Sequence, residues 1–123
     1  MNRHVVRAAD SQSGQIGQYG LLTDRPVSGP GCRRPVVVVQ GDALNRSRIS
    51  TVVCLPLTSN VRWEVAPGNV LLPMRLTGLA QDSVANVSQI IALDRDLLTE
   101  CVGKLPRTKL NLILAGVDVV LGR

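Results

Sequence analysis

A run of four consecutive valines constrains the fold of this 123-residue chain more than any other stretch. The run lies in RRPVVVVQGD, residues 33–42, directly after two arginines and a proline. Four β-branched residues in succession predict a strand, roughly residues 35–40, that is buried on both faces. Arg33 and Arg34 therefore carry permanent charges at the entrance of the most buried strand, where a stiff strand would hold them in a fixed position.

Other short apolar stretches, separated by turn residues, continue this strand pattern along the chain. Pro56 is expected to halt one of the strands, because proline cannot donate to a strand ladder. Residues 94–106 are expected to form a short element between two turns. Besides the valine strand, strands are predicted within 14–22, at 51–57, at 69–73 and around 90–91.

The end of the chain shows a different period, which is typical of a helix. Apolar residues recur every three or four positions, and Gly122 stands where a helix C-cap glycine belongs. Short strands followed by one helix predict a mainly β fold with α, namely a small and largely antiparallel barrel. The residues of the predicted buried helix face are Leu110, Ile113, Leu114, Val117 and Val120.

The chain is long enough for one domain with one core. Residues 1–13 are polar and aperiodic, and are expected to form a flexible leader before a domain at 14–123. The sequence is 45% apolar without any phenylalanine, so the core must consist of Val, Leu, Ile and Ala. No apolar run follows the basic N-terminal residues, and none approaches the roughly 20 residues of a membrane span. Neither a signal peptide nor a membrane segment is therefore expected.

Charge and cysteine content narrow the partners and the chemistry. A net charge of +5 and a pI of about 9.9 favour a polyanionic partner, although a basic protein can also bind no anion. Cys32, Cys54 and Cys101 form no CxxC pair, and the single histidine is His4 in the leader. Neither a disulfide framework nor a zinc site is predicted, and no metal or cofactor is expected. The cysteines are expected to be small buried apolar residues in a reducing compartment, the cytoplasm.

Four stretches, taken together and in order, give the chain a family likeness. They are RRPVVVVQGD (33–42), LPLTSN (55–60), PGNVLLP (67–73) and TGLAQDSVANVSQI (77–90). They resemble the MazF/PemK toxins of bacterial type II toxin–antitoxin systems, from about Ser28 to the C-terminus. The resemblance implies an SH3-like barrel with a C-terminal helix. It also implies a homodimeric endoribonuclease that cuts single-stranded RNA and is silenced by a small MazE-like antitoxin.

The same resemblance assigns roles to individual residues. Arg34, just before the proline of the first motif, and Thr58, at the end of the next strand, are implied to be catalytic. Ser28 resembles a loop serine six residues before that arginine, although the acidic residue that often follows it is Gly29 here. Asn45 resembles a loop asparagine that helps to hold RNA. The other residues expected to bind RNA are Arg33, Arg46, Arg48, Ser59 and Asn60.

The chemistry of these residue types fits the implied reaction. RNA cleavage without a metal uses the neighbouring 2′-hydroxyl as nucleophile and needs positive charge beside the pentavalent phosphate. The guanidinium of Arg34 offers a planar fork of donors that matches phosphate oxygens, and Thr58 can place a hydroxyl beside the same phosphate. Without the family likeness, Arg34 would be a solvated flank or a carboxylate partner, and Thr58 a turn residue.

Other positions also allow either a structural or a functional interpretation. Asn45 could simply nucleate a turn, and Arg46 and Arg48 could form a solvated loop face. Trp63 is expected in the core rather than as a base-stacking platform, and Asp82 is expected to cap a turn or a helix end.

Two alternatives keep the fold but change the function. Some relatives of this barrel poison DNA gyrase by binding it, although the RRP and LTSN motifs favour a nuclease. The usual first strand of the family carries an acidic and an aromatic residue, whereas this chain has Gly14, Gln15, Ile16 and Gly17. The difference leaves open a non-catalytic member that binds RNA or an antitoxin.

Overall fold

The computed structural model of the chain describes residues 12–20 and 33–123. Most of the expected leader, the loop serine Ser28, Gly29 and Cys32 lie outside these residues. Within them the chain forms seven strands and three α-helices, joined in part by 3₁₀ turns. The strands are β1 (Gln15–Gly20), β2 (Arg33–Val38), β3 (Thr51–Thr58), β4 (Val70–Leu72), β5 (Ser83–Ala85), β6 (Ile91–Asp94) and β7 (Leu98–Lys104), and the helices are α1 (Asp42–Asn45), α2 (Met74–Thr77) and α3 (Arg107–Leu121).

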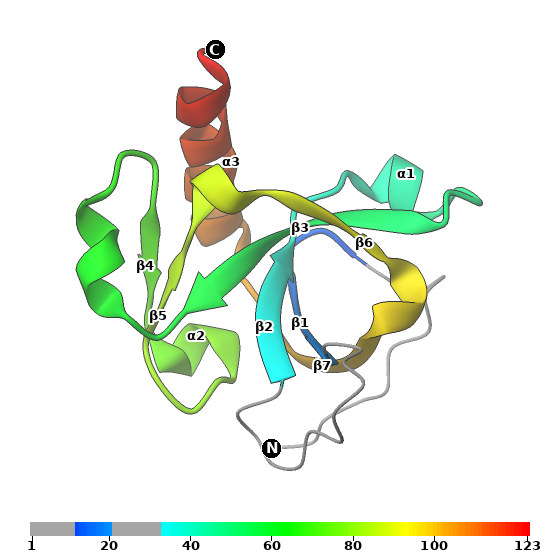
Figure 1. Ribbon diagram of the computed structural model, residues 1–123, viewed down its shortest axis with the longest axis horizontal. Coiled ribbons are helices and arrows are strands. Elements are labelled where there is room, and N and C mark those ends of the chain that lie inside the picture. Colours follow the sequence, from blue (N-terminus) through cyan, green and yellow to red (C-terminus); the bar gives the residue numbers. More distant parts are fainter. Residues whose placement is uncertain (1–11, 21–32) are drawn as a thin grey trace.

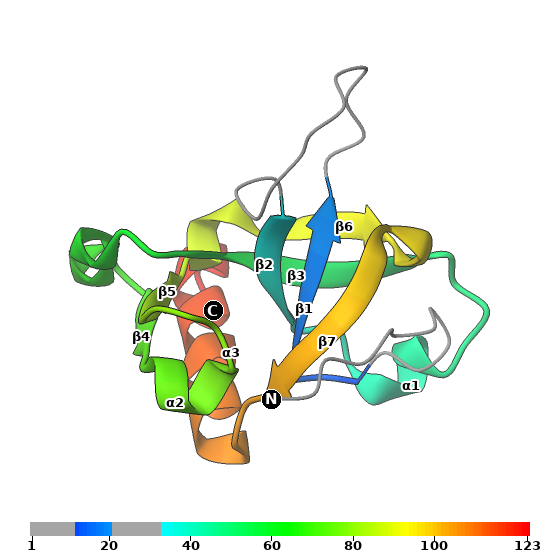
Figure 2. The ribbon, with the colours of Figure 1, turned by 90° about the horizontal axis from the view of Figure 1, so that it is seen from below.

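The strands form one strongly curled antiparallel sheet, as the sequence predicts (Figure 1). Its order is β4-β5-β3-β2-β1-β7, and β6 pairs with the first half of β3. In the turned view of Figure 2, β1 lies between β2 and β7, while α3 lies at the β4–β5 end of the sheet. The arrangement is a partly open small barrel with a C-terminal helix, so the predicted fold class is confirmed.

The valine strand is buried on both faces, also as predicted. Val36, Val37 and Val38 are at most 1% exposed, and alternation along β2 sends them into two different apolar clusters. Val37 packs with Ile16 and Leu55, whereas Val36 and Val38 pack with residues of β3, β6 and β7. Arg34 shares its face with Val36 and Val38, because residues two apart in a strand point the same way.

Pro56 does not halt its strand, and this prediction was wrong. The strand continues to Thr58 because β3 changes partners at the proline: Cys54 is the last residue paired with β6, and Leu57 is the first paired with β5. The carbonyl oxygen of Pro56 accepts a hydrogen bond from Asn86 on that side. The N–H that proline lacks would point to the same side of β3, where Pro56 lies between the residues paired with β6 and those paired with β5. No strand-to-strand hydrogen bond is therefore lost at the proline.

The C-terminal helix is confirmed, but its buried face is shorter than predicted. Leu110 and Ile113 are buried, whereas Val120 is 41% exposed near the end of the helix. Gly122 ends the helix in the left-handed conformation, with φ of 73°, as expected for a C-cap. None of the helices within the described residues is long and apolar enough to cross a membrane.

Two further predictions fail at segments with weak patterns. Residues 98–104 form the seven-residue strand β7 rather than a short element, because β1 supplies a full-length partner for it. Trp63 is 52% exposed and does not belong to the core, since it lies in a 3₁₀ turn, Val61–Val65, that projects beyond the sheet. Asp82 does cap a helix end, as expected: its carboxylate accepts a hydrogen bond from the N–H of Met74 at the start of α2.

Candidate functional site

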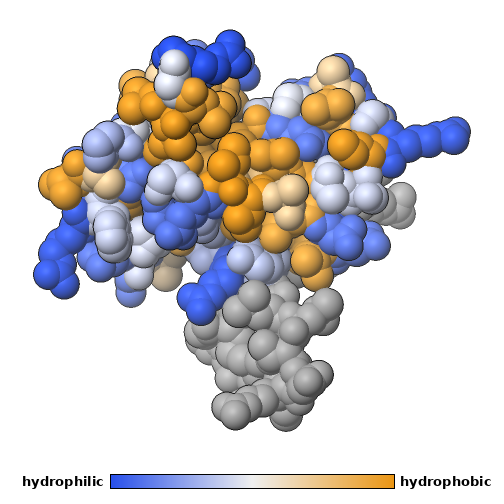
Figure 3. All heavy atoms as spheres, turned by 45° about the horizontal axis from the view of Figure 1, so that its top comes forward, coloured by the Kyte–Doolittle hydropathy of each residue, from blue (hydrophilic) through white to orange (hydrophobic). Residues whose placement is uncertain are grey.

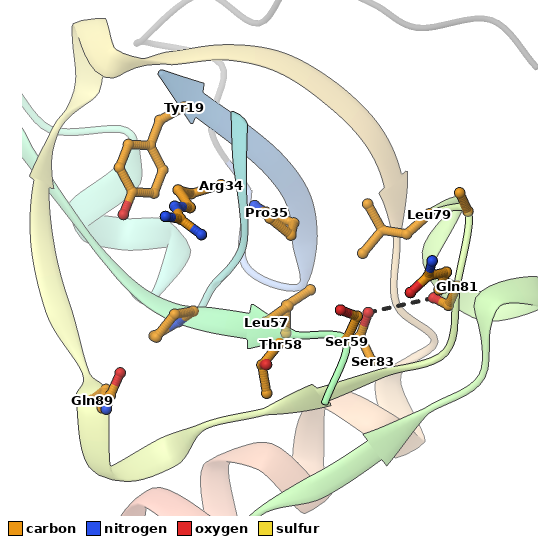
Figure 4. A pocket seen from close by; sticks show the side chains of 12 residues that line it. Tyr19, Arg34, Pro35, Leu57, Thr58, Ser59, Leu79, Gln81, Ser83 and Gln89 are labelled. Carbon is orange, nitrogen blue, oxygen red and sulfur yellow. Dashed lines mark hydrogen bonds between the residues drawn. The ribbon is translucent and has the colours of Figure 1, made fainter. Parts of the chain in front are cut away.

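Strands β2 and β3 form a hairpin whose open end carries the two residues predicted to be catalytic. Val36 pairs with Pro56, and the same register carried two residues further puts Arg34 opposite Thr58. Both side chains lie on the face of the sheet that carries Val36 and Val38. They line a hollow of about 700 Å³ at this end of the sheet (Figure 4).

Arg34 lies in solvent near the start of the otherwise buried strand β2. Its strand is held by Val36 and Val38 in the core, yet Arg34 itself is exposed. Among the described residues, no side chain or backbone group forms a hydrogen bond or ion pair with its guanidinium. A guanidinium fixed at its base and open at its donors can bind an anion without first losing a protein partner.

Thr58 is half-buried at the other wall of the hollow. Its hydroxyl oxygen accepts a hydrogen bond of 3.1 Å from the N–H of Asn60, which leaves the hydroxyl proton free to be donated. Asn60 in turn begins the 3₁₀ turn, where its side-chain oxygen accepts from the N–H of Arg62 at 3.3 Å. The turn therefore orients the hydroxyl of Thr58 with its donor side available.

The remaining predicted residues near this end are spread unevenly. Ser59 is exposed and lines the hollow, whereas Asn60 is occupied as the cap of the turn and does not line it. Arg33 is the first residue of β2, and its side chain lies outside what the structure describes, as does Ser28.

The structure adds residues that sequence reasoning missed. Tyr19 of β1 pairs with Arg34 across the sheet and lines the same hollow. Figure 4 shows Tyr19 and Arg34 side by side, Gln89 near their end of the hollow, and Leu79 and Gln81 at the opposite end. The only sequence signal for Tyr19 was its rarity, because the chain has one tyrosine and one tryptophan.

At the other end of the β2–β3 hairpin, Asn45 serves the fold. The side chain of Asn45 is 1% exposed and bonds to Gln40 in both directions: its amide donates to the Gln40 carbonyl at 2.9 Å, and its oxygen accepts from the Gln40 side chain at 3.0 Å. The amide also donates to Asp42, whose carboxylate accepts a further bond from the N–H of Ser13. Both polar atoms of the Asn45 side chain therefore bond within the loop.

A buried arginine completes this second end. Arg95 is 6% exposed and donates to the carbonyl oxygens of Leu44 and Asn45, both at 2.8 Å. These carbonyls end the short helix α1, where helix carbonyls lack intrahelical partners. The carboxylate of Asp42 belongs to the same network. It accepts hydrogen bonds from the Ser13 N–H and from the Asn45 amide, and these bonds, the first more than the second, lower the pKa of Asp42 from 3.8.

Arg46 and Arg48 are exposed as expected, but they do not lie beside Arg34. Thr51 and Thr58 stand at opposite ends of β3, which separates them by roughly 23 Å at about 3.3 Å per residue. The loop that carries Arg46 and Arg48 precedes Thr51, next to α1 in Figure 1. The structure thus divides the predicted site between two ends of one hairpin.

Neither a metal cluster nor a reactive cysteine stands out in the described part of the chain. No group of three or more His, Cys, Asp or Glu side chains there is placed to hold a metal ion. Burial raises the pKa of the Cys54 thiol to about 12, which keeps it neutral, and Cys101 is half-buried. Cys54 is thus a small apolar core residue, as predicted.

Apolar side chains also gather on one outer face. Figure 3 shows apolar surface over the C-terminal part of α3 and the adjoining sheet. Val120 of α3 is 41% exposed, and Ile90, 37% exposed, stands directly before β6. Leu112 and Val119, 52% and 58% exposed, lie seven residues apart on another side of α3, where both line a second hollow. Clustered apolar surface of this kind is typical of an interface.

Comparison with known proteins gives consistent results. Residues 14–121 match the family described as PemK-like, MazF-like toxin of type II toxin–antitoxin system. Endoribonuclease MazF6 of Mycobacterium tuberculosis (strain ATCC 25618 / H37Rv) is 43% identical over 98 residues, which cover 78% of this chain and 86% of the relative. Endoribonuclease MazF of Staphylococcus saprophyticus is 31% identical over 108 residues, covering 86% and 89% of the two chains.

Solved structures support the fold at lower sequence identity. The Mycobacterium tuberculosis toxin MazF-mt6 superposes with a TM-score of 0.70 at 18% identity, covering 88% of this chain and 96% of that one. A chain of a MazE–MazF crystal structure from Deinococcus radiodurans gives a TM-score of 0.71 at 22% identity, with 91% and 95% covered. Family match, curated relatives and fold agree, and the chain belongs to the PemK/MazF toxins of type II toxin–antitoxin systems.

Proposed function

We propose that this toxin is an endoribonuclease that cleaves single-stranded RNA without a metal, at the hollow between Arg34 and Thr58. The observation that supports it most is the open guanidinium of Arg34 opposite the hydroxyl of Thr58. The curated relatives at 43% and 31% identity carry the name endoribonuclease. The cytoplasm, where messenger RNA is translated, is the compartment that fits this activity.

The reaction begins with attack of the 2′-oxygen on the adjacent phosphorus. Solvent water takes the proton of the attacking 2′-hydroxyl, a pentavalent phosphate with extra negative charge forms, and the bond from phosphorus to the 5′-oxygen then breaks as water returns a proton to that oxygen. Arg34 stabilises the developing charge through two parallel N–H hydrogen bonds to two oxygens of the phosphate. The Thr58 hydroxyl donates a hydrogen bond to another oxygen of the same phosphate. The products carry a 2′,3′-cyclic phosphate and a 5′-hydroxyl.

Proton transfer is the smaller part of the protein's contribution. Among residues 12–20 and 33–123, no histidine and no carboxylate lines the hollow. A guanidinium is a weak base, so Arg34 acts first through charge and position. Alignment of the 2′-oxygen with the scissile bond supplies the rest, because a fixed geometry removes much of the entropic barrier.

The two ends of the hairpin contribute differently to RNA binding. Arg33, Ser59 and Asn60, together with Ser28 from the segment that precedes β2 in the sequence, hold the nucleotides around the cleaved bond. Arg46 and Arg48 contact phosphates remote from that bond, and Asn45 acts by shaping their loop. Each phosphate contact adds to affinity and to its salt dependence.

Cleavage of a defined RNA in EDTA, followed by end-group analysis, tests the proposal. We expect cyclic phosphate and 5′-hydroxyl ends without added metal. A strict need for magnesium, or products with 5′-phosphates, would contradict the mechanism. Binding of RNA without any cleavage would favour the non-catalytic alternative.

The antitoxin competes for the same charges. A hollow that holds a phosphate also attracts carboxylates, and a disordered acidic segment can order along it. A MazE-like antitoxin with an acidic tail is therefore the expected inhibitor. Competition between that tail and RNA, measured by displacement of a labelled oligonucleotide, is the test, and tight peptide binding with unchanged RNA affinity would place the inhibitory site elsewhere.

A second copy of the chain covers the apolar face of α3. Val120 and Ile90 are both exposed, and a homodimer that covers the apolar surface at this end of α3 would bury them. We expect light scattering to give a dimer at micromolar concentration, and the double variant Ile90→Asp, Val120→Asp to give a folded monomer. An unchanged dimer in this variant would assign the interface to another face, such as the one with Leu112.

A further inference from the structure

Tyr19 stands in a row of side chains that crosses three strands. It pairs with Arg34 on one side and with Leu98 on the other. Paired residues of antiparallel strands share a face, with Cβ atoms about 5 Å apart. Tyr19 is thus held between a buried leucine and the guanidinium that takes the phosphate.

One side of the Tyr19 ring contacts the hydrophobic core. The ring packs against the cluster that contains Val36, Val38 and Leu98, yet Tyr19 is only half-buried and also lines the hollow. Among the described residues no hydrogen bond to its hydroxyl is found. A ring that is fixed on one side and open on the other is a surface for stacking rather than a core filler.

An amide lies near the same end of the hollow. Gln89, in the 3₁₀ turn Val87–Gln89, is exposed and lines the hollow on the side of Tyr19 and Arg34 (Figure 4). No hydrogen bond to its side chain is found within the described part of the chain. A glutamine amide offers a donor and an acceptor side by side, which is the pattern that base edges present.

We propose that Tyr19 and Gln89 form a nucleobase subsite for the nucleotide next to the cleaved phosphate, with the base stacked on Tyr19 and its edge facing Gln89. This inference rests on the proposed RNA substrate. Single-stranded RNA is recognised through unstacked bases, and aromatic rings beside a basic group are the usual platform for them. Arg34 would then hold the phosphate while Tyr19 holds the neighbouring base.

The experiment compares intact and abasic RNA. Wild-type cleavage first maps the cut, and a 2′-deoxy nucleotide there gives a non-cleavable ligand for binding. We expect Tyr19→Leu to weaken binding of intact RNA by roughly 10- to 100-fold, and to change little when the adjacent nucleotide is abasic. Tyr19→Phe, which keeps the ring, should bind within about threefold of the wild type, because stacking needs no hydroxyl.

Two controls separate stacking from folding and from charge. Trp63→Leu removes the other aromatic ring, which does not line the hollow, and should leave the abasic penalty unchanged. Tyr19→Leu should keep the salt dependence of the wild type, since no phosphate contact is lost. Equal losses on intact and abasic RNA, or a Tyr19→Phe variant as weak as Tyr19→Leu, would overturn the subsite.

Base choice tests the role of Gln89. Gln89→Glu replaces a donor by an acceptor, so preference at this position should move toward guanine, whose N1–H and N2–H are adjacent donors. An unchanged preference would remove Gln89 from the subsite.

If the wild type cleaves no RNA, the proposed function fails. If it cleaves and abasic sites cost nothing in the wild type, only the subsite fails, whether or not a Tyr19 variant folds.

Discussion

Arg95, from the turn after β6, lies against one end of the β2–β3 hairpin and Arg34 stands at the other end, and the two guanidinium groups have opposite environments. At one end Arg95 is buried and donates to two carbonyl oxygens, and every polar atom of the Asn45 side chain is hydrogen-bonded. At the other end Arg34 is exposed, and the described residues offer its guanidinium no partner. A polar group whose bonds are complete stabilises the fold, whereas one left incomplete is available to a ligand.

The largest effect is expected from Arg34→Ala. Loss of charge beside the phosphate should lower the cleavage rate by about a hundred- to a thousandfold. The unfolding midpoint should stay the same, because the side chain is exposed. Rate assays and thermal melts on the same preparation check both, and Arg34→Lys should recover little because lysine lacks the planar fork. A destabilised Arg34→Ala would make the two ends alike and break the comparison.

Thr58→Val should have the next largest effect. The substitution keeps the shape but removes the hydroxyl, and we expect the cleavage rate to fall about a hundredfold. Part of the loss comes from the turn, since the Thr58 oxygen also accepts from the N–H of Asn60. Thr58→Ser restores both roles and is the matched control, so an inactive serine variant would assign the effect to packing.

Asn45→Ala should reverse the pattern. Removing a buried amide leaves the Gln40 carbonyl without its side-chain donor and takes one acceptor from the Gln40 side chain, which should lower the free energy of unfolding by about 2 kcal/mol. The single-turnover cleavage rate at saturating RNA should stay near that of the wild type. Urea denaturation and rate assays test this. A variant that stays stable but loses its cleavage rate would show that Asn45 acts on the hollow at the other end of the hairpin.

Arg46→Ala and Arg48→Ala should change little. Because both lie at the far end of the hairpin from Arg34, each removes at most one remote phosphate contact and lowers the salt slope of binding by about one unit or less. Titrations of a long RNA at several salt concentrations measure the slope. A loss of cleavage on short RNA would place this loop at the hollow after all.

The smallest effect concerns acid stability at the closed end. The folded-state pKa of Asp42 lies below 3.8, so its contribution to stability is present above that pH and is lost as the pH falls through the folded value. Asp42→Asn should therefore show a slightly smaller loss of stability on acidification than the wild type. Unfolding midpoints at neutral pH and below 3.8 measure the difference, and identical losses would remove Asp42 from the network.

Sequence reasoning reached the local features and missed those that depend on register. The valines and the helical period define β2 and α3 because burial repeats along the chain itself. Pro56 misled because its missing donor meets a break in the ladder that only the pairing of β3 with two strands creates.

The site shows the same limit. Arg34 and Thr58 follow from motifs, but Tyr19 joins them only through the pairing of β1 with β2. Asn45 and Arg48 are three residues apart in one polar loop, and no sequence pattern distinguishes the buried one from the exposed one. The contacts with Gln40 and Asp42 decide it.

The pairing of β1 with both β2 and β7 ties the site to the order of synthesis. The strand that carries Tyr19 gains its second partner only when residues 98–104 have been made, and Gly14 receives its bond from Leu105 later still. Pairing between distant segments must wait for both. A nascent chain on the ribosome that has not reached residue 98 therefore lacks the second partner of the strand that carries Tyr19, and this side of the hollow is complete only once residues 98–105 have been made.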